Sequence, residues 1–159
     1  MRKSKASYYL DIAEAVLSRS TCLRRKYGAV IVRDDEIIST GYNGSPRGTP
    51  NCCDTGHCPR EENHIPHGED YTLCRSVHAE ANAIISAARR DMIGATLYLA
   101  GREADGRPVD AAPCAMCQRL IINAGISTIV TRNADGTVNS KCVKGGSNWA
   151  ALCNSEVKA

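Results

Sequence analysis

The chain has 159 residues, a formal net charge of +3 and no phenylalanine. This length favours one domain over residues 1–159, with a core of Ile, Val, Leu, Ala and a few Tyr. The mild positive charge suits a small anionic substrate but falls short of a nucleic-acid-binding surface, and no apolar run is long enough to span a membrane. Nine cysteines without an export signal indicate reduced thiols and metal ligation, and hence a cytoplasmic location.

The first third of the chain predicts a helix followed by a hairpin. Apolar residues recur at i, i+3, i+4 and i+7, which is typical of an amphipathic helix over residues 5–18. Two β-branched runs at residues 29–32 and 37–40 are separated by Asp34 and Asp35, and this pattern predicts a β-hairpin. The second run leads into Gly41 and Pro46, where Gly and Pro end regular structure.

Residues 44–76 form a long stretch without a regular pattern. A structureless segment of this length inside a compact domain is usually disordered or functional. This one is rich in potential metal ligands, and a bound metal would hold it in place. These ligands are Cys52, Cys53, His57, Cys58, His64, His67 and Cys74.

The second half predicts alternating helices and strands. Helical periodicity runs over residues 78–90, a strand over 96–99, a polar loop over 101–112, and a helix from Pro113 to a stop at Gly125. A further strand is expected at 126–131, an edge strand at 137–143 and a short helix at 147–152. This order indicates a layered α/β domain with helices packed on a sheet.

Two short motifs carry the chemistry. His78 and Glu80 open one expected helix, while Cys114 and Cys117 follow Pro113 at the start of another. One imidazole and two thiolates would bind a zinc ion (Zn²⁺) and leave its fourth position open to water, as in catalytic zinc sites. Glu80 would then carry the proton of a hydrolytic reaction.

Three other interpretations are compatible with these motifs. A lone Cys-x-x-Cys pair with a distant His is also compatible with a structural zinc site or a redox-active cysteine pair. A non-enzymatic binding module stabilised by zinc is a third possibility, but it would leave Glu80, two residues after His78, without a function. The joint occurrence of His-x-Glu, of Pro113 before the first cysteine and of a strand between the motifs favours the catalytic site.

The sequence resembles the cytidine and deoxycytidylate deaminase superfamily, and within it the deoxycytidylate (dCMP) deaminases. The resemblance implies a three-layer α/β/α sandwich with a mixed central sheet flanked by helices. It also implies zinc-dependent hydrolysis of dCMP to dUMP and ammonia, in which water attacks C4 and Glu80 shuttles the proton. The segments that carry it are residues 28–31, 38–46, 51–54, 78–84 and the Pro-Cys-x-x-Cys motif.

The same resemblance implies further roles. Asn43 would contact the substrate sugar, and the backbone near Ala79 and Val77 would contact the pyrimidine edge. Many family members are hexamers that dCTP activates and dTTP inhibits with magnesium (Mg²⁺). By this resemblance the chain is expected to be a homo-oligomer with nucleotide effectors.

Some family members hold a second, structural zinc ion. Cys22 and Cys52 match two of its ligands. The remaining matching positions differ here, so His67 and Cys74 are expected to substitute for them, with His57, Cys58 and His64 as rivals. Some of these residues could instead be free thiols or solvated histidines.

The chain departs from the family pattern in two places. An insertion at 101–112 precedes Pro113, and the tail after Arg132 lacks a recognisable phosphate contact. The insertion could be a surface loop or a lid that changes what the pocket accepts, so another cytosine nucleoside, nucleotide or base stays an alternative substrate. Four arginines are alternative candidates for the residue that binds the substrate phosphate, and each could instead be a solvated surface charge. They are Arg24, Arg47, Arg102 and Arg107.

The Pro-Cys-Ala-Met-Cys motif at residues 113–117 also resembles that of tRNA adenosine deaminases. Such an enzyme needs an RNA-binding surface, which the modest charge and few aromatic residues do not favour. The segment around Asn43 also fits the nucleotide branch better. No nucleic-acid partner is therefore expected.

Overall fold

The computed structural model describes residues 1–143, and the expected helix at 147–152 lies outside them. A five-stranded sheet forms the centre, with strand order β2-β1-β3-β4-β5. Only β3 and β4 are parallel, so the sheet is mixed, as expected. The strands are β1 (Arg25–Arg33), β2 (Glu36–Tyr42), β3 (Thr96–Glu103), β4 (Thr128–Arg132) and β5 (Val138–Cys142).

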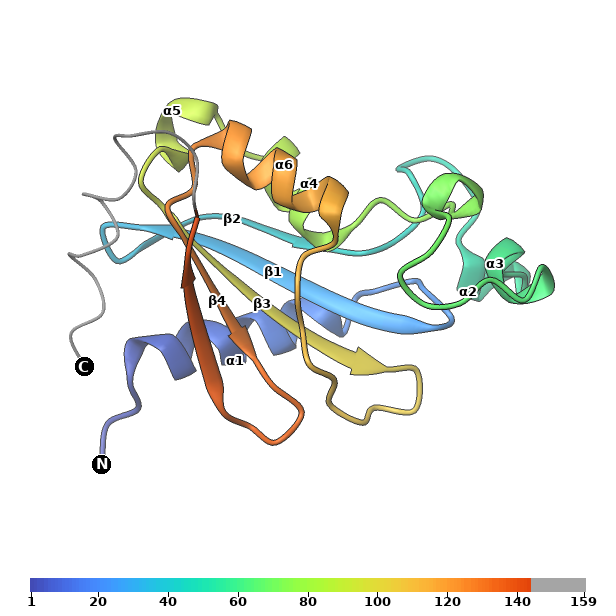
Figure 1. Cartoon of the computed structure of the whole chain (residues 1–159), viewed down its shortest axis with the longest axis horizontal. Helices are drawn as coiled ribbons and strands as arrows, with labels where there is room; N and C mark the ends of the chain where they lie inside the picture. The colour runs from blue at the N-terminus through green and yellow to red at the C-terminus, as the bar shows by residue number, and fades with distance from the viewer. Residues whose placement is uncertain (144–159) are drawn as a thin grey trace.

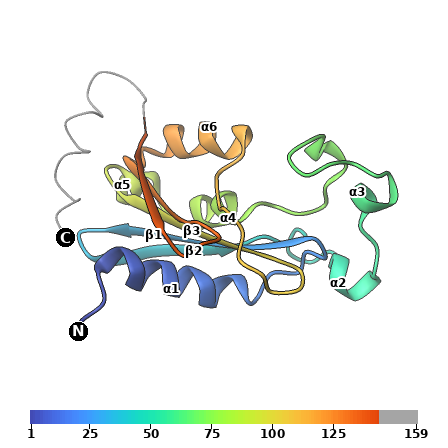
Figure 2. The same cartoon turned by 60° about the horizontal axis from the view of Figure 1, so that its bottom comes forward.

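Helices cover both faces of this sheet and make three layers. Helix α1 (Lys5–Leu17) lies on one face, and α4 (Ala79–Ile85), α5 (Arg89–Met92) and α6 (Ala115–Ala124) lie on the other (Figures 1 and 2). The three-layer α/β/α arrangement expected from the resemblance is confirmed.

The alternation of side chains along β1 explains why this strand is apolar throughout. Ala29 and Ile31 belong to the core beneath α4 and α6, whereas Val30 and Val32 pack with α1. Successive side chains of a strand point to opposite faces, so a strand covered on both sides needs an uninterrupted apolar run.

Two glycines allow the helices to approach the sheet closely. A Cβ on Gly28 would lie 2.1 Å from the carbonyl oxygen of Ala13 in α1. A Cβ on Gly41 would lie 2.3 Å from the carbonyl oxygen of Ala79 in α4. Because neither backbone contact leaves room for a side chain, glycine sets the distance of each helix from the sheet.

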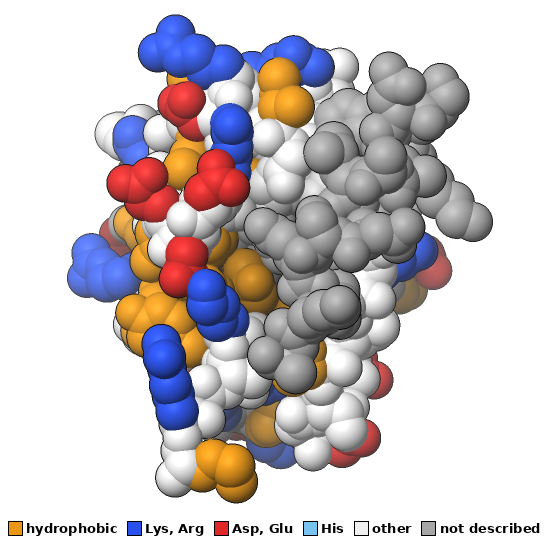
Figure 3. All heavy atoms as spheres, turned by 90° about the vertical axis from the view of Figure 1, so that its left-hand side faces the viewer, with side chains coloured by type: hydrophobic (Ala, Val, Ile, Leu, Met, Phe, Trp, Pro, Cys, Tyr) orange, Lys and Arg blue, Asp and Glu red, His pale blue; other side chains and the backbone are white. Residues whose placement is uncertain are grey.

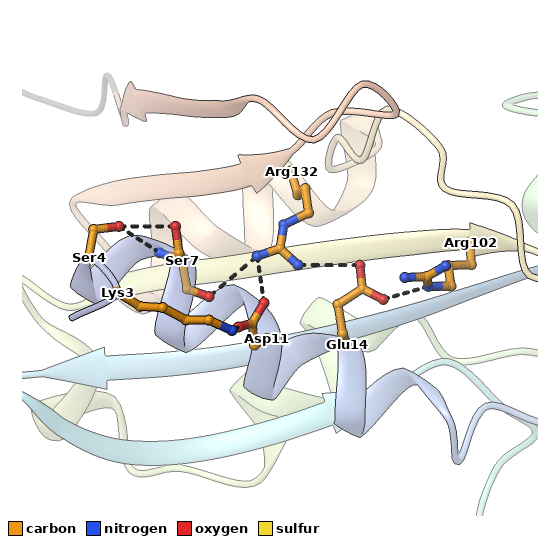
Figure 4. Close-up of polar contacts among 7 residues, drawn as sticks. All are labelled: Lys3, Ser4, Ser7, Asp11, Glu14, Arg102 and Arg132. Atoms are coloured by element: carbon orange, nitrogen blue, oxygen red, sulfur yellow. Dashed lines mark hydrogen bonds and ion pairs between the residues drawn. The ribbon is translucent and has the colours of Figure 1, made fainter. Parts of the chain in front are cut away.

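Ion pairs fasten α1 to the strands beneath it (Figure 4). Arg132 of β4 donates from Nη2 to Asp11 Oδ1 at 2.8 Å, and Arg102 of β3 donates from Nε to Glu14 Oε2 at 2.6 Å. Lys3 pairs with the other oxygen of Asp11 at 2.6 Å. These bonds join the N-terminal helix to strands that follow it by about a hundred residues in the chain.

The expected helix over residues 78–90 is two helices. Helix α4 ends at Ile85, where Ser86 donates its hydroxyl to the carbonyl oxygen of Asn82 at 2.8 Å. Ala88 is extended, and α5 begins after it. A serine hydroxyl that bonds the backbone in this way competes with the helix, and this explains the early end.

The expected loop at 101–112 begins as a strand. Its first three residues continue β3 to Glu103 because they pair with Arg25, Lys26 and Tyr27 of β1. The chain then turns at Gly106, and Pro108 bridges back to Arg102. Pairing with a strand far away in sequence cannot be read from local polarity.

The segment over residues 44–76 is irregular, as expected, apart from three short pieces. They are α2 (Cys52–Thr55), α3 (Pro59–Glu62) and the 3₁₀ helix η1 (Tyr71–Leu73). Most cysteines of the described residues are free thiols, but Cys142 is disulfide-bonded, contrary to the expectation of reduced thiols throughout.

The surface gives no sign of a large field of one charge on the face drawn in Figure 3. Basic and acidic side chains lie among one another there, around exposed apolar side chains. Among residues 1–143, no helix has the length and apolar character required to cross a membrane.

Candidate active site

Helices α4 and α6 bring the two motifs together on one face of the sheet. His78 is the residue immediately before α4, and Cys114 is the residue immediately before α6. Cys117 lies in the first turn of α6 and is buried. Helix α6 therefore starts two residues after Pro113 rather than at it.

The three expected ligands lie close enough to hold one ion. His78 Nδ1 is 3.4 Å from Cys114 Sγ and 3.4 Å from Cys117 Sγ. Tetrahedral zinc bonds of about 2.3 Å to sulfur and about 2.0 Å to nitrogen place such atoms roughly 3.5 Å apart. All three ligand atoms lie within 4.8 Å of one another, and they are the only such group found among the described residues.

The surroundings favour a neutral imidazole at His78. Burial and the nearby Arg60 guanidinium lower the pKa of His78, and a neutral ring is the form that binds metal. Burial, with the Glu80 and Cys114 charges beside it, raises the pKa of the Cys117 thiol. A bound cation would oppose this effect and stabilise the thiolate.

Glu80 lies beside these ligands and is 5% exposed. Burial raises the pKa of Glu80 to about 7, while a hydrogen bond with Cys117 acts in the opposite direction. A carboxyl group whose pKa lies near neutrality can both accept and return a proton, which is what general acid–base catalysis requires.

A chain of ring contacts, which sequence reasoning missed, supports His78. The ring of Tyr71 meets the His78 ring edge-on at 4.7 Å, and the Arg60 guanidinium lies 4.5 Å from the centroid of Tyr71. Arg60 is 5% exposed and donates to the carbonyl oxygens of Pro66 and Glu69 at 2.7 and 2.5 Å. An arginine among many charged residues carries no signal of its own in the sequence.

Asn43 is buried at the wall of the cavity that His78, Glu80 and Cys114 line. Its Oδ1 accepts from the Tyr27 backbone N–H at 2.8 Å and the Ser20 hydroxyl at 2.6 Å. Its Nδ2 donates to the Arg25 carbonyl oxygen at 2.8 Å. One amide N–H is therefore left to offer to a substrate, because an asparagine has two donors and two acceptor lone pairs.

The two backbone positions expected to contact the pyrimidine are placed differently. Ala79 lines the cavity with Asn43 and Glu80. Val77 is not among the residues that line this cavity. It exchanges two backbone hydrogen bonds with Gly44, of 2.8 and 3.1 Å, and these bonds hold the residue after Asn43 beside the residue before His78.

The candidate ligands of a second metal fall into two places. Cys52 is buried, and Cys22, Cys58 and Cys74 are near enough to raise its pKa, although burial is the larger cause. Burial lowers the pKa of His67, and the charges of Arg25, Arg24 and Arg60 act in the same direction. Neither His57 nor His64 lines the cavity, and His57 pairs with Glu62 at 2.8 Å.

Comparison with known proteins agrees with this geometry. The model of the cytidine and deoxycytidylate deaminase zinc-binding region matches residues 3–133. The chain belongs to this family. Deoxycytidylate deaminase of Mycobacterium phage D29 is 43% identical over 77% of this chain and 90% of its own length.

Two other members of the deaminase family show how far the likeness extends. Deoxycytidylate deaminase of Saccharomyces cerevisiae is 41% identical over 82% of this chain, which spans 38% of the yeast protein. The crystal structure of dCMP deaminase from cyanophage S-TIM5 in complex with dCMP and dUMP matches with a TM-score of 0.59. It is 26% identical and covers 86% of this chain and 89% of its own.

Proposed function

We propose that this protein catalyses the hydrolytic deamination of dCMP to dUMP and ammonia. The observation that carries the proposal is the cluster of His78, Cys114 and Cys117 with the buried carboxyl of Glu80 beside it. Its support comes from the relatives, which include deoxycytidylate deaminases of phage and yeast. One deaminase domain would account for the chain.

The proposed metal ligands would bind zinc, and Glu80 would transfer the proton. His78, Cys114 and Cys117 would hold zinc and leave one position open. When bound, zinc makes a water molecule acidic enough to serve as the nucleophile at neutral pH. Glu80 would take the proton of that water, deliver it to the ring nitrogen N3, and protonate the leaving amino group.

Other residues would orient the nucleotide. The free amide N–H of Asn43 would donate to the sugar, and the backbone of Ala79 would contact the pyrimidine edge. Val77 would act through its pairing with Gly44, which holds the loop beside Asn43. These assignments rest on the family resemblance and on the cavity that these elements line.

A substrate panel tests the function. The purified protein is incubated with dCMP, CMP, cytidine, deoxycytidine and dCTP, and ammonia release is followed. We expect dCMP to have the highest kcat/KM. Absence of dCMP turnover would contradict the substrate assignment, and turnover of another cytosine compound would identify the alternative.

We also propose a second, structural zinc ion in the segment over residues 44–76. The proposed ligands are Cys22, Cys52 and Cys74, with Cys58 in place of His67 as the fourth, because Cys22, Cys58 and Cys74 contribute to the raised pKa of Cys52. Their ligand atoms do not form a close group like that of His78, Cys114 and Cys117 among the described residues, so a zinc ion would have to draw them together. Zinc would hold together a segment with little regular structure of its own. We expect two zinc ions per chain in the wild type and one in Cys58→Ser, with two retained in His67→Ala. One zinc per wild-type chain would contradict the second site.

The remaining family properties are proposed in the same way. They are a homo-oligomer, a hexamer by resemblance, activation by dCTP, inhibition by dTTP with Mg²⁺, and a cytoplasmic location. Sedimentation would measure the oligomeric state. Assays of dCMP turnover with dCTP, or with dTTP and Mg²⁺, would measure the response to effectors.

A further inference from the structure

The cavity that His78, Glu80 and Cys114 line is small for a nucleotide. Its volume is about 70 Å³, whereas cavities that bind small molecules usually measure about 300–1,000 Å³. A neighbouring cavity of about 350 Å³ shares three lining residues with it, His67 among them. A wall of the inner cavity must therefore move before a pyrimidine nucleotide can reach the candidate metal site.

The wall that the sheet and α4 form is held firmly. The Asn43 side chain is fixed by hydrogen bonds to the Ser20 hydroxyl and to the backbone of Tyr27 and Arg25. Gly41 lies directly against the backbone of Ala79, the first residue of α4. Movement of this wall would break these hydrogen bonds and disturb the core between the sheet and α4.

The opposite wall belongs to a self-contained segment over residues 58–74, from which His67, Tyr71 and Cys74 line the cavity. Among the described residues, every hydrogen bond and ion pair of this segment has its partner within residues 57–74. Figures 1 and 2 show the segment, with α3, at one end of the sheet and outside its three layers. It can therefore move without breaking a hydrogen bond to the rest of the described chain.

Arg60 makes this segment one compact unit. Its side chain is buried, and Nη2 donates to the carbonyl oxygens of Pro66 and Glu69. The same guanidinium lies 4.5 Å from the centroid of the Tyr71 ring. Because one side chain ties the start of the segment to its middle and to Tyr71, these parts would move together.

The chain is anchored on both sides of the segment. Before it, the Cys53 backbone N–H donates to the Thr21 carbonyl oxygen at 3.2 Å. After it, Val77 is paired with Gly44. Gly56 lies between the first anchor and the segment, with φ of +69° and open space around it. A compact loop between two fixed points can pivot about its ends, as the lids of many enzymes do.

We propose that residues 58–74 form a lid that opens to admit the nucleotide and closes over the bound base, with Tyr71 as the residue that closes it. The Tyr71 ring meets the His78 ring edge-on at 4.7 Å, so the closed lid reaches the candidate metal site through this contact. Closure would exclude water from the cavity around Glu80. A second zinc bound by Cys58 and Cys74 would hold the two ends of the lid and let its middle move. This inference rests on the proposed function, because it assumes that a pyrimidine nucleotide enters the inner cavity.

Amide hydrogen exchange of the zinc-loaded protein, followed by mass spectrometry, tests the lid directly. Without a nucleotide, we expect residues 58–74 to exchange faster than α4 and α6 and to be protected to a similar degree along their length, because they open as one unit. In saturating dUMP, the proposed product, exchange of the same residues should slow at least about 10-fold. Strand β5, which lines neither the inner cavity nor the lid, is the internal control and should not change.

Variants of Tyr71 test the closing contact through the rates of dUMP binding, measured by stopped flow. Tyr71→Ala should release dUMP about 3- to 10-fold faster, the range of one aromatic contact, and should bind it at least as fast as the wild type. A merely structural role predicts slower association instead. Tyr71→Phe keeps the ring and should behave as the wild type. Leu73→Ala is the matched control, because Leu73 lies in the same 3₁₀ helix and is 45% exposed.

Three results would overturn the proposal. They are exchange of residues 58–74 as slow as that of α4 and α6 in the free protein, exchange that bound dUMP leaves unchanged, and dUMP release equally fast from Tyr71→Ala and Leu73→Ala. Failure of the proposed function is a separate result, because it would appear as wild-type protein that releases no ammonia from dCMP. Exchange in the free protein would then still decide whether residues 58–74 open as a unit.

Discussion

At the scale of the residue, the candidate site contains groups whose burial disfavours their charged forms. Burial raises the pKa of Glu80 to about 7 and lowers that of His78. Displaced pKa values of this kind are typical of functional sites, because a buried charge needs a specific partner. Zinc would be that partner for the thiolates, and the substrate would be the partner for Glu80.

Replacement of the proton carrier is the first prediction. Glu80→Gln keeps the size of the side chain but removes its ability to exchange a proton. We expect the variant to bind zinc as the wild type does and to lose at least about 100-fold in kcat. Ammonia release and metal content are the measurements, and normal deamination by this variant would contradict the mechanism.

Removal of the metal is the second prediction. Incubation with a zinc chelator should abolish deamination, and added zinc should restore it, because the three protein ligands act only through the ion they hold. Cys114→Ala should prevent this recovery. Full activity in a sample shown to be free of zinc would contradict the role of the cluster.

At the scale of the element, the position of α4 depends on its contact with β2. Gly41 lies against the backbone of Ala79, the first residue of α4, and His78 lies immediately before that helix. A displacement of α4 would therefore move His78, the proposed metal ligand. The segment over residues 58–74 acts on the same histidine from the other side, through Arg60 and Tyr71.

Gly41→Ala is the third prediction. The added methyl group would clash with the carbonyl oxygen of Ala79, and we expect a loss of about 1–3 kcal/mol in the free energy of unfolding together with weaker zinc binding. Gly136→Ala is the control, since it adds a methyl group in open space at a turn with φ of +85°. It should lose about 1–2 kcal/mol through backbone strain and keep its zinc affinity.

Arg60→Ala is the fourth prediction. It removes the two hydrogen bonds to Pro66 and Glu69 and the contact with Tyr71. We expect faster amide hydrogen exchange in residues 58–74 and weaker zinc binding, because Tyr71 would no longer be held against His78. Arg75→Ala, at the exposed position that directly follows this segment, should change neither. Unchanged exchange in the Arg60 variant would contradict this role.

At the scale of the whole molecule, ion pairs join the N-terminal helix to strands β3 and β4, which lie far along the chain (Figure 4). Asp11 lies between Lys3 and Arg132, and hydrogen bonds from these two cations hold its pKa below the usual value. The ionised form of Asp11 is thus favoured in the folded state. Its stabilising contribution is complete above the usual Asp pKa of about 4 and is lost as the pH falls through the lowered value.

Asp11→Asn is the fifth prediction. We expect it to lower the free energy of unfolding by up to about 1 kcal/mol at neutral pH, because the pair is partly exposed and screened by solvent. The difference from the wild type should shrink below about pH 4 and at high salt. Denaturant unfolding across pH measures this, with Glu36→Gln in the exposed β1–β2 hairpin as the control. A difference that grew on acidification would contradict the assignment.

The sequence by itself determined the layered α/β class and the hairpin, and it predicted the residues that the structure brings together, His78, Cys114 and Cys117 with Glu80. These follow from short-range patterns, since the side-chain period, the turn residues and the ligand spacing all lie within a few residues. Only the tertiary structure decided that the Arg60 guanidinium lies on the Tyr71 ring beside His78, that Cys58 lies near enough to Cys52 to affect its pKa, and that Arg24 has a guanidinium nitrogen without a hydrogen-bond partner among the described residues. Each of these depends on contacts between segments far apart in the chain, and the partner of a charged side chain is set by the packing of the elements that carry it.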